Sequence, residues 1–283
     1  MRFSSVLPAR ERGAGSFSVK AVDLSAIGDL GSPVLVLDDF RVQGSPFAPH
    51  PHAGFSAVTY VFEDSPGRLR SRDSLGHDVE VGPGGIVWTQ AGRGVLHHEV
   101  PADLRRELHG LQLFVNLSAR NKLLAPRMLS LASRDVPVWL SDEGDRVRVV
   151  AGSYAGVTSP LVPPEPFDFL DIALRRRIAY DLPLGNCAIV YVAAGETRIR
   201  AGDQERTVAE EHAIALHGSG GQVTFAAASP ARFVVLSGAA IHEPVLTDGP
   251  FIMNDRSQIE AAVARYRAGE MGDLAPLAEV AVG

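Results

Sequence analysis

The sequence predicts an all-β protein built from two β-barrels in tandem, with a short helix near the C-terminal end. Short apolar or alternating segments recur along the chain, and most are bounded by Gly, Pro or Asp. The 28 glycines and 19 prolines supply the turns that many short strands need. Both halves carry the same pattern, in which a strand ending in Gly precedes a hairpin. This repetition indicates a divergent duplication of one barrel.

The expected strands fall into two sets. Each segment has the apolar or alternating character of a buried or half-buried strand. The first set comprises residues 34–37, 57–62, 85–88, 111–117 and 147–151, with 136–140 as a further candidate. The second set comprises residues 167–174, 188–192, 196–200, 213–216, 222–225 and 232–237.

The boundary between the two domains is expected between residues 135 and 136. The N-terminal domain then comprises residues 1–135 and the first barrel. The C-terminal domain comprises residues 136–283, with the second barrel and the helix. Residues 158–166 are too rich in proline for a central strand, so we expect a loop that opens the second barrel.

One helix is expected, from near Asp255 to about Ala268. Asp255 or the preceding Asn254 can cap its first turn, because a short polar side chain accepts hydrogen bonds from free backbone N–H groups there. Apolar side chains recur within it at helical spacing, at Ile259, Val263 and Tyr266.

Composition excludes several classes of protein. With 46% apolar and 21% charged residues, the chain is typical of a soluble globular protein. A net charge of −6 argues against general nucleic-acid binding, because phosphate contacts need a basic surface. No apolar run approaches the roughly 18–20 residues that span a bilayer, and no signal peptide is recognisable. Cys187 is the single cysteine, which fits a reducing compartment, so we expect a cytoplasmic protein and a monomer.

Two histidine-containing triplets point to a metal site. His50-Pro51-His52 and His97-His98-Glu99 each carry donor groups two residues apart. On a β-strand such residues point to the same face, so each triplet can direct two donors into one cavity. Strand alternation selects His97 and Glu99 and turns His98 outward or toward the other domain. One such triplet alone is also typical of an ordinary polar strand end, so it is the pair that favours a metal.

The residues around these triplets resemble a known family. His50-x-His52 after Gly44, a glycine-bounded hairpin and a third histidine resemble the metal-binding layout of the cupin superfamily. The usual cupin glutamate shortly after His-x-His is missing, and the carboxylate stands instead at Glu99, as in pirins. Further segments that resemble pirin signatures are residues 49–55, 72–76, 91–99, 110–117 and 249–254.

The resemblance to pirins carries expectations about fold and function. It implies two jelly-roll-like cupin domains of which only the first keeps a metal, held by His50, His52, His97 and Glu99. It implies quercetin 2,3-dioxygenase activity, the cleavage of a flavonol by dioxygen. The alternative implied by the family is a non-catalytic role, in which the iron is a redox sensor that acts through a regulatory protein partner. Fe(II) is the expected metal, although Cu, Mn, Ni and Zn accept the same ligands.

Further site residues are expected around the metal. Glu99 is a candidate base as well as a ligand. By resemblance Gln112 lies near the metal, although strand alternation alone equally allows it to face solvent. Phe55 and Phe114 are expected either to line an apolar mouth or to belong to the ordinary core. The expected ligands are a small phenolic substrate and O2, with no direct nucleic-acid or membrane contact.

Overall fold

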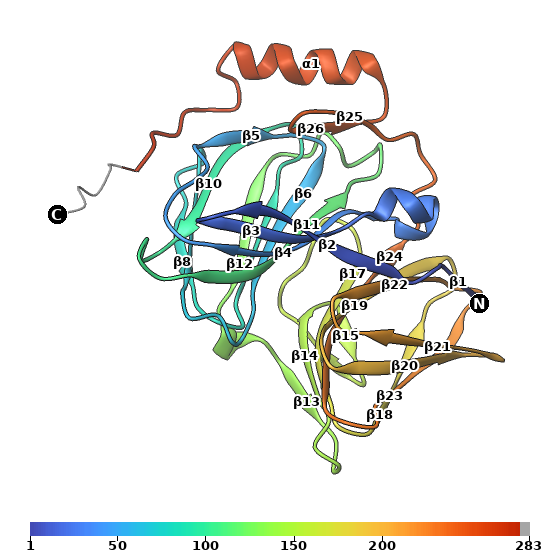
Figure 1. Cartoon of the computed structure of the whole chain (residues 1–283). Helices are drawn as coiled ribbons and strands as arrows, with labels where there is room; N and C mark the ends of the chain where they lie inside the picture. The colour runs from blue at the N-terminus through green and yellow to red at the C-terminus, as the bar shows by residue number, and fades with distance from the viewer. Residues whose placement is uncertain (278–283) are drawn as a thin grey trace.

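The computed structural model of the chain describes residues 1–277. It contains two β-barrels that lie side by side, with the helix on the outside of one of them (Figure 1). The all-β, two-barrel architecture predicted from the sequence is confirmed. The predicted helix is α1, Arg256–Arg267, and its N-cap Asp255 accepts a hydrogen bond from the Gln258 N–H at 2.9 Å. Within the described residues no helix has both the length and the apolar character to cross a membrane.

The first barrel consists of two sheets that face each other. All strand pairs in both sheets are antiparallel. The larger sheet has the order β12 (Arg127–Leu131), β9 (Ile86–Gln90), β6 (Phe55–Val61), β11 (Leu108–Asn116), β4 (Val34–Val42), β3 (Phe17–Val22) and β2 (Leu7–Ala14). The smaller sheet has the order β5 (His50–His52), β10 (Val95–Pro101), β7 (Leu69–Asp73) and β8 (Asp78–Val81).

The second barrel repeats this arrangement. Its larger sheet has the order β22 (His212–His217), β19 (Asn186–Ala194), β24 (Ala231–Ala239), β17 (Phe167–Leu174), β14 (Arg146–Ala151) and β13 (Val138–Leu140). Its smaller sheet has the order β18 (Arg177–Leu182), β23 (Gly221–Ala226), β20 (Glu196–Ala201) and β21 (Gln204–Ala209). The remaining short pairs join β1 (Arg2–Phe3) to β22, β15 (Ser153–Tyr154) to β16 (Val157–Thr158), and β25 (Leu246–Asp248) to β26 (Phe251–Met253).

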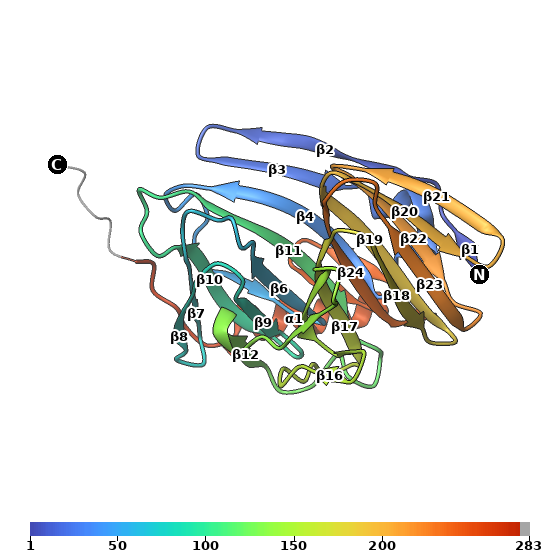
Figure 2. The same ribbon diagram turned by 90° about the horizontal axis from the view of Figure 1, so that it is seen from below.

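Both ends of the described chain cross to the opposite barrel. At the N-terminal end, β1 and the start of β2 pair with β22, so the larger sheets of the two barrels are continuous through β2 (Figure 2). At the C-terminal end, β26 forms a bridge from Phe251 to Ala53, and α1 packs over it. The domain boundary between residues 135 and 136 stays a prediction.

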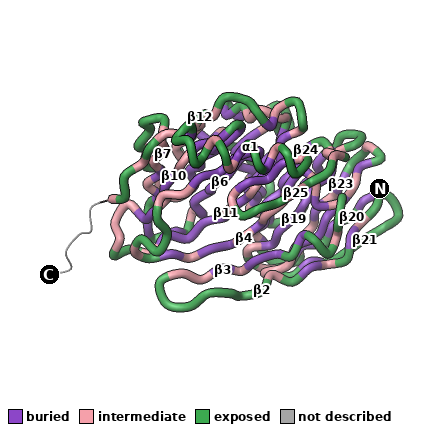
Figure 3. The backbone as a smooth tube through the Cα atoms, turned by 90° about the horizontal axis from the view of Figure 1, so that it is seen from above, coloured by how far each residue is buried: buried purple, intermediate pink, exposed green. Residues whose placement is uncertain are grey.

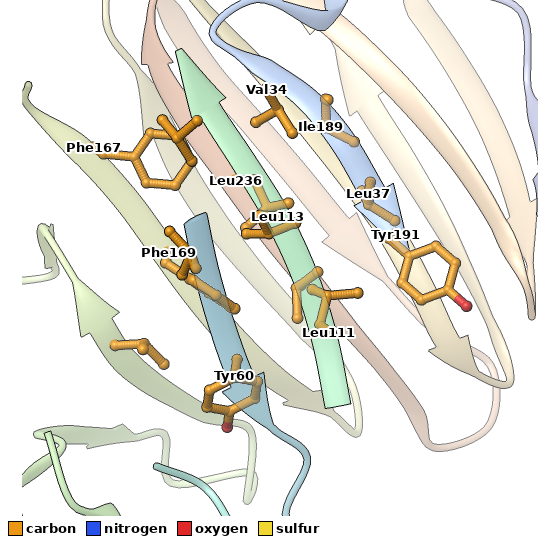
Figure 4. Packing of buried hydrophobic residues seen from close by; sticks show 14 of the residues in the cluster. Val34, Leu37, Tyr60, Leu111, Leu113, Phe167, Phe169, Ile189, Tyr191 and Leu236 are labelled. Atoms are coloured by element: carbon orange, nitrogen blue, oxygen red, sulfur yellow. The ribbon is translucent and has the colours of Figure 1, made fainter. Parts of the chain in front are cut away.

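The largest apolar cluster lies between the two barrels rather than inside either. Figure 4 shows side chains from both larger sheets packing against each other, among them Leu37, Leu111 and Leu113 from the first and Phe169 and Ile189 from the second. All five are at most 1% exposed. Burial of this surface favours the association of the barrels, since apolar contact area removed from water is the main stabilising contribution in folding.

The interiors of the two barrels differ. The second is filled by apolar side chains from both of its sheets, such as Ile172, Val190 and Phe225. The apolar cluster inside the first barrel is smaller and leaves space beside it for a cavity. Figure 3 shows that buried residues run along the central strands and exposed residues along β2 and on α1.

The strands at the centre of the larger sheets were predicted from the sequence, and several of those missed have a common feature. Each of the twelve expected segments overlaps an observed strand, and residues 159–166 form the expected loop. The hairpin of β2 and β3, the pair β7 and β8, and the strands β12, β18 and β21 were missed. These strands carry many charged or polar residues on an outer face, so their alternation is weak.

Candidate metal centre

The two histidine triplets form adjacent strands at one edge of the first barrel. β5 holds His50 and His52, and β10 holds His97, which pairs directly with His50. β5 is an edge strand, as Pro51 requires, because proline has no N–H to donate to a second neighbour. The antiparallel pairing brings the imidazoles together on the face that looks into the barrel.

The three imidazoles converge closely enough to share a cation. The Nε2 atoms of His50 and His97 are 3.1 Å apart, and one ring nitrogen from each of the three residues lies within 4.8 Å of the others. His52 completes the cluster, with ring-centre distances of 4.8 Å to His50 and 4.5 Å to His97. Two nitrogens bound to one transition metal lie about 3–4 Å apart, because each bond is about 2.1 Å long. The spacing therefore suits a metal.

Burial keeps two of these imidazoles, His52 and His97, uncharged. Burial, together with the smaller effect of the neighbouring His50, lowers the pKa of His52 to about 3. Burial and the other two imidazoles hold the pKa of His97 well below its usual range. The Nδ1 atoms of His52 and His97 are buried without a hydrogen-bond partner among the described residues. Neutral imidazoles with free lone pairs are the form that binds a metal, so the cluster fits a divalent transition metal.

Glu99 lies on the same cavity wall but outside the group of three. Its Oε1 accepts a hydrogen bond from Ser71 Oγ at 3.0 Å, and its Oε2 accepts one from Thr59 Oγ1 at 2.5 Å. Burial raises the pKa of Glu99, and the two hydroxyl groups oppose this rise in part. The structure thus places a hydrogen-bonded carboxylate beside the cluster, and its role as a fourth ligand is a proposal.

His98 takes the alternate direction along β10. Its Nε2 contacts the carbonyl oxygen of Phe47 at 2.9 Å, while its neighbours His97 and Glu99 line the cavity. His98 thus points away from the cavity, as expected, but it reaches neither solvent nor the other barrel, because the side chain is 2% exposed beneath the loop that carries Phe47. Strand alternation fixes the face of a side chain but not what covers that face.

A cavity of about 210 Å³ opens to solvent beside the histidines. Its wall is mainly apolar with a few converging polar groups, as is typical of small-molecule sites. The polar side chains that line it are Asp38, His50, His52, His97, Glu99 and Gln112. The apolar ones are Phe17, Val19, Phe40, Val42, Phe47, Leu69, Leu108 and Phe114.

The three residues predicted around the metal take different places. Gln112 lines the cavity, where its Oε1 lies 3.0 Å from Thr59 Oγ1 and its Nε2 donates to the Val58 carbonyl oxygen at 3.1 Å. Phe114 also lines the cavity. Phe55, expected either at the mouth or in the ordinary core, is fully buried behind Phe114, with ring centres 4.4 Å apart, and so belongs to the core.

Sequence reasoning missed several side chains at the site. Asp38 lines the cavity from β4, and Thr59 and Ser71 hold Glu99. Lys122 lies under the turn that follows β5, where its Nζ donates to the Gly54 carbonyl oxygen at 2.9 Å. Strand alternation around the buried Leu37 was a signal for Asp38, whereas nothing in the sequence distinguished Lys122 from a surface lysine.

Comparison with known proteins identifies the relatives of this chain. Residues 18–115 match the family model described as pirin, and residues 169–272 match the one described as the pirin C-terminal cupin domain. A Pseudomonas aeruginosa protein with the provisional name quercetin 2,3-dioxygenase is 35% identical over 250 residues, which cover 84% of this chain and 86% of that protein. The chain belongs to the pirin family. The resemblance to pirins predicted from the sequence is therefore confirmed.

Solved structures agree with a pirin fold of two cupin domains. A quercetin 2,3-dioxygenase from Acinetobacter baumannii superimposes with a TM-score of 0.83 at 24% identity, over 97% of this chain and 99% of that chain. An Escherichia coli pirin in complex with nickel(II) superimposes with a TM-score of 0.66 at 17% identity, over 85% of this chain and 100% of that chain. At these identities the likeness shows the fold of this pirin.

Proposed function

We propose that this pirin binds one divalent transition metal in its first barrel and uses it to cleave a flavonol or a similar phenol with dioxygen. The observation that carries the proposal is the convergence of His50 with the buried, uncharged His52 and His97 on an apolar cavity that opens to solvent. The Pseudomonas and Acinetobacter relatives support it through the activity that they are named for.

The proposed ligands are three imidazoles and the carboxylate of Glu99. Three neutral nitrogens and one negative oxygen leave a divalent cation with a net charge of about +1, which favours an anionic oxygen from the substrate. The bound metal supplies Lewis acidity, which lowers the pKa of a coordinated hydroxyl group. Fe(II) is the metal that we propose, and the nickel(II) complex of the E. coli pirin supports the binding of a divalent cation by this fold.

Glu99 is also the proposed proton acceptor. Its burial raises the pKa of the carboxyl group, whereas coordination to a cation would lower it, so Glu99 would act as a base only while it is not bound to the metal. Ser71 and Thr59 hold one oxygen each, so the group is fixed at the cavity wall and still able to accept a proton. Loss of either hydroxyl group frees the carboxylate to rotate away from the substrate.

The apolar wall selects the kind of substrate. Phe40, Val42 and Phe114 offer flat or branched apolar surfaces that fit an aromatic ring. The ring excludes water from the polar groups around it, and hydrogen bonds and charges act more strongly in that environment. A small phenol therefore suits this cavity better than a sugar or a peptide.

A second candidate function is non-catalytic. His50 is half-buried at the mouth of the cavity, beside Phe47, whose side chain is 46% exposed. A change in the charge of iron at this position would reach the nearby surface, where a protein partner could respond to it. The open apolar cavity favours catalysis, because a sensor needs no space for a substrate. The cytoplasmic location and the monomeric state stay predictions.

Oxygen consumption tests the catalytic proposal. We expect iron(II)-loaded protein to consume oxygen only when quercetin is added, and the His97→Ala variant to consume none above background. Near-ultraviolet circular dichroism of the variant checks that its barrels remain folded. No quercetin-dependent uptake by wild-type protein that holds its iron stoichiometrically would contradict catalysis and favour the sensor.

A further inference from the structure

Asp38 is a carboxylate in the cavity wall with no assigned role. It lies on β4 among apolar lining residues and is half-buried. Within residues 1–277 its side chain makes no hydrogen bond or ion pair with another side chain or with the backbone. Burial raises the pKa of Asp38, and the charge of Arg12 opposes this rise. A polar group that is held in an apolar wall without a partner is available for a ligand.

Strand alternation fixes the direction of Asp38. Its neighbour Leu37 packs between the barrels (Figure 4), and its neighbour Asp39 is bonded to Tyr191 of the second barrel at 2.8 Å. Residues on either side of a strand position point to the opposite face of the sheet. Asp38 therefore projects away from the second barrel and into the cavity, and only a rearrangement of β4 could turn it elsewhere.

The polar groups nearest to Asp38 along the sheet make their hydrogen bonds with other partners. Asp38 pairs with Gln112, and Gln112 pairs with Thr59, so these three side chains form a row across neighbouring strands. Gln112 directs its amide toward β6, through its contacts with Val58 and Thr59. The single proton of Thr59 serves the shorter contact, which is to Glu99. The wall thus leaves Asp38 without a donor.

The row of Asp38, Gln112 and Thr59 also sets the distance between Asp38 and the residue that holds Glu99. Neighbouring strands lie about 4.8 Å apart, so Asp38 is about 10 Å along the sheet from Thr59, which holds Glu99. A ring system whose hydroxyl group lies at the histidine cluster and Glu99 extends along this wall toward Asp38. When such a ring fills the cavity it displaces water from the carboxylate, and an unpaired carboxylate is then costly to bury.

We propose that Asp38 accepts a hydrogen bond from a second hydroxyl group of the substrate, remote from the one that binds at the metal. The substrate class is then a polyhydroxylated aromatic compound rather than a phenol with a single hydroxyl group. This inference rests on the proposed function of the cavity. Asp38 is a specificity residue in this scheme, and it takes no part in holding the metal.

Two flavonols distinguish the hydroxyl group that binds at the metal from the one that would bind at Asp38. Quercetin and 3-hydroxyflavone share the hydroxyl and keto groups that chelate a metal, but 3-hydroxyflavone lacks the other hydroxyl groups. Their dissociation constants are measured under argon with nickel(II)-loaded protein, from the absorption change on chelation. The proteins are wild type, Asp38→Asn and the control Asp142→Asn, whose side chain is exposed on a loop of the second barrel.

Wild-type protein and Asp142→Asn are expected to bind quercetin more tightly than 3-hydroxyflavone. In Asp38→Asn the ratio of the two dissociation constants should fall by about tenfold. A hydrogen bond to a charged group corresponds to a change in affinity of at least about that size. The affinity for 3-hydroxyflavone is expected to stay unchanged. An equal loss for both compounds, or a preference that Asp38→Asn retains, would overturn the role of Asp38 alone. Failure of wild-type protein to bind either compound would overturn the proposed function and this inference with it.

Discussion

At the scale of single residues, the histidines of the candidate metal centre are destabilising in acid when no metal is bound. Burial lowers the pKa of His52 to about 3, whereas the same side chain in the unfolded chain has a pKa near 6.5. Between these values the unfolded chain binds a proton that the folded protein does not. The stability that depends on neutral His52 is therefore complete above pH 6.5 and is lost as the pH falls toward 3.

This difference predicts the acid sensitivity of the metal-free protein. We expect the unfolding free energy contributed by His52 to fall by about 2 kcal/mol from pH 7.5 to pH 5. Urea unfolding of the chelator-treated protein at both pH values measures it. In His52→Asn this part of the pH dependence should disappear, whereas His242→Asn, which changes an exposed histidine, should retain it. Equal pH dependence in the two variants would show that His52 is not buried in neutral form.

Sequence reasoning found some residues of the site and missed others for a physical reason. His50, His52 and His97 were found because imidazoles two residues apart on a strand share a face, which depends on local geometry alone. Asp38 was missed because it stands beside Asp39, and a pair of aspartates is typical of a strand end. Only the packing of β4 between cavity and interface shows which of the two carboxylates faces which side.

At the scale of elements, the turn after β5 is held by a buried lysine. The Nζ atom of Lys122 donates to the carbonyl oxygens of Gly54 and Ile252, at 2.9 and 3.1 Å, and to Asn116 Oδ1 at 2.7 Å. Gly54 has a φ of +88°, and a Cβ there would collide with the Ile252 carbonyl oxygen. Lys122 thus fixes the turn two residues after His52 and joins it to β26.

We predict that Lys122→Met lowers both stability and metal affinity. Methionine has a similar shape but leaves three buried acceptors without a donor, which costs about 2–4 kcal/mol in unfolding free energy. Burial lowers the pKa of Lys122 to about 8, so its ammonium group still carries its proton at pH 7. Urea unfolding and nickel(II) titration measure the two effects.

The chain provides a matched control for this variant. Lys20 is its other lysine, and it forms a half-exposed ion pair with Glu211 at 2.6 Å. Because such pairs contribute little, Lys20→Met should change the unfolding free energy by less than about 1 kcal/mol and leave nickel(II) affinity intact. Similar losses in both variants would contradict the role given to Lys122.

The elements themselves were predictable to the extent that one face of each is apolar. Strands in the middle of the sheets, such as β19 and β24, carry long apolar runs and were recognised. The hairpin of β2 and β3 was not, because most of β2 faces solvent and its sequence is rich in Arg, Glu and Gly. Its place as the bridge between the two larger sheets depends on pairing with β22, about 200 residues away in the chain.

At the scale of the whole molecule, two reciprocal hydrogen bonds join the barrels within their apolar interface. Tyr60 of the first barrel donates to Asp171 Oδ2 of the second at 2.6 Å, and Tyr191 of the second donates to Asp39 Oδ2 of the first at 2.8 Å. Both tyrosines are fully buried. These bonds orient the sheets, and Asp39 links the interface directly to the strand that carries Asp38.

Removal of one of these hydroxyl groups should loosen the association of the barrels. We expect Tyr191→Phe to lower the unfolding free energy by about 1–3 kcal/mol, because Asp39 then loses a buried donor. Thermal unfolding followed by circular dichroism measures the change, with Tyr266→Phe on exposed α1 as the control. A variant as stable as the control would show that the interface is held by apolar contacts alone.

The measurement that tests the central claim most directly is the metal content of two neighbouring histidine variants. His97 and His98 are adjacent on β10, but His97 points into the cluster and His98 points to Phe47. After equilibration with iron(II) or nickel(II) and removal of free metal, wild type and His98→Ala should hold one metal per chain, and His97→Ala almost none. Equal metal content in all three folded proteins would contradict the metal centre proposed here.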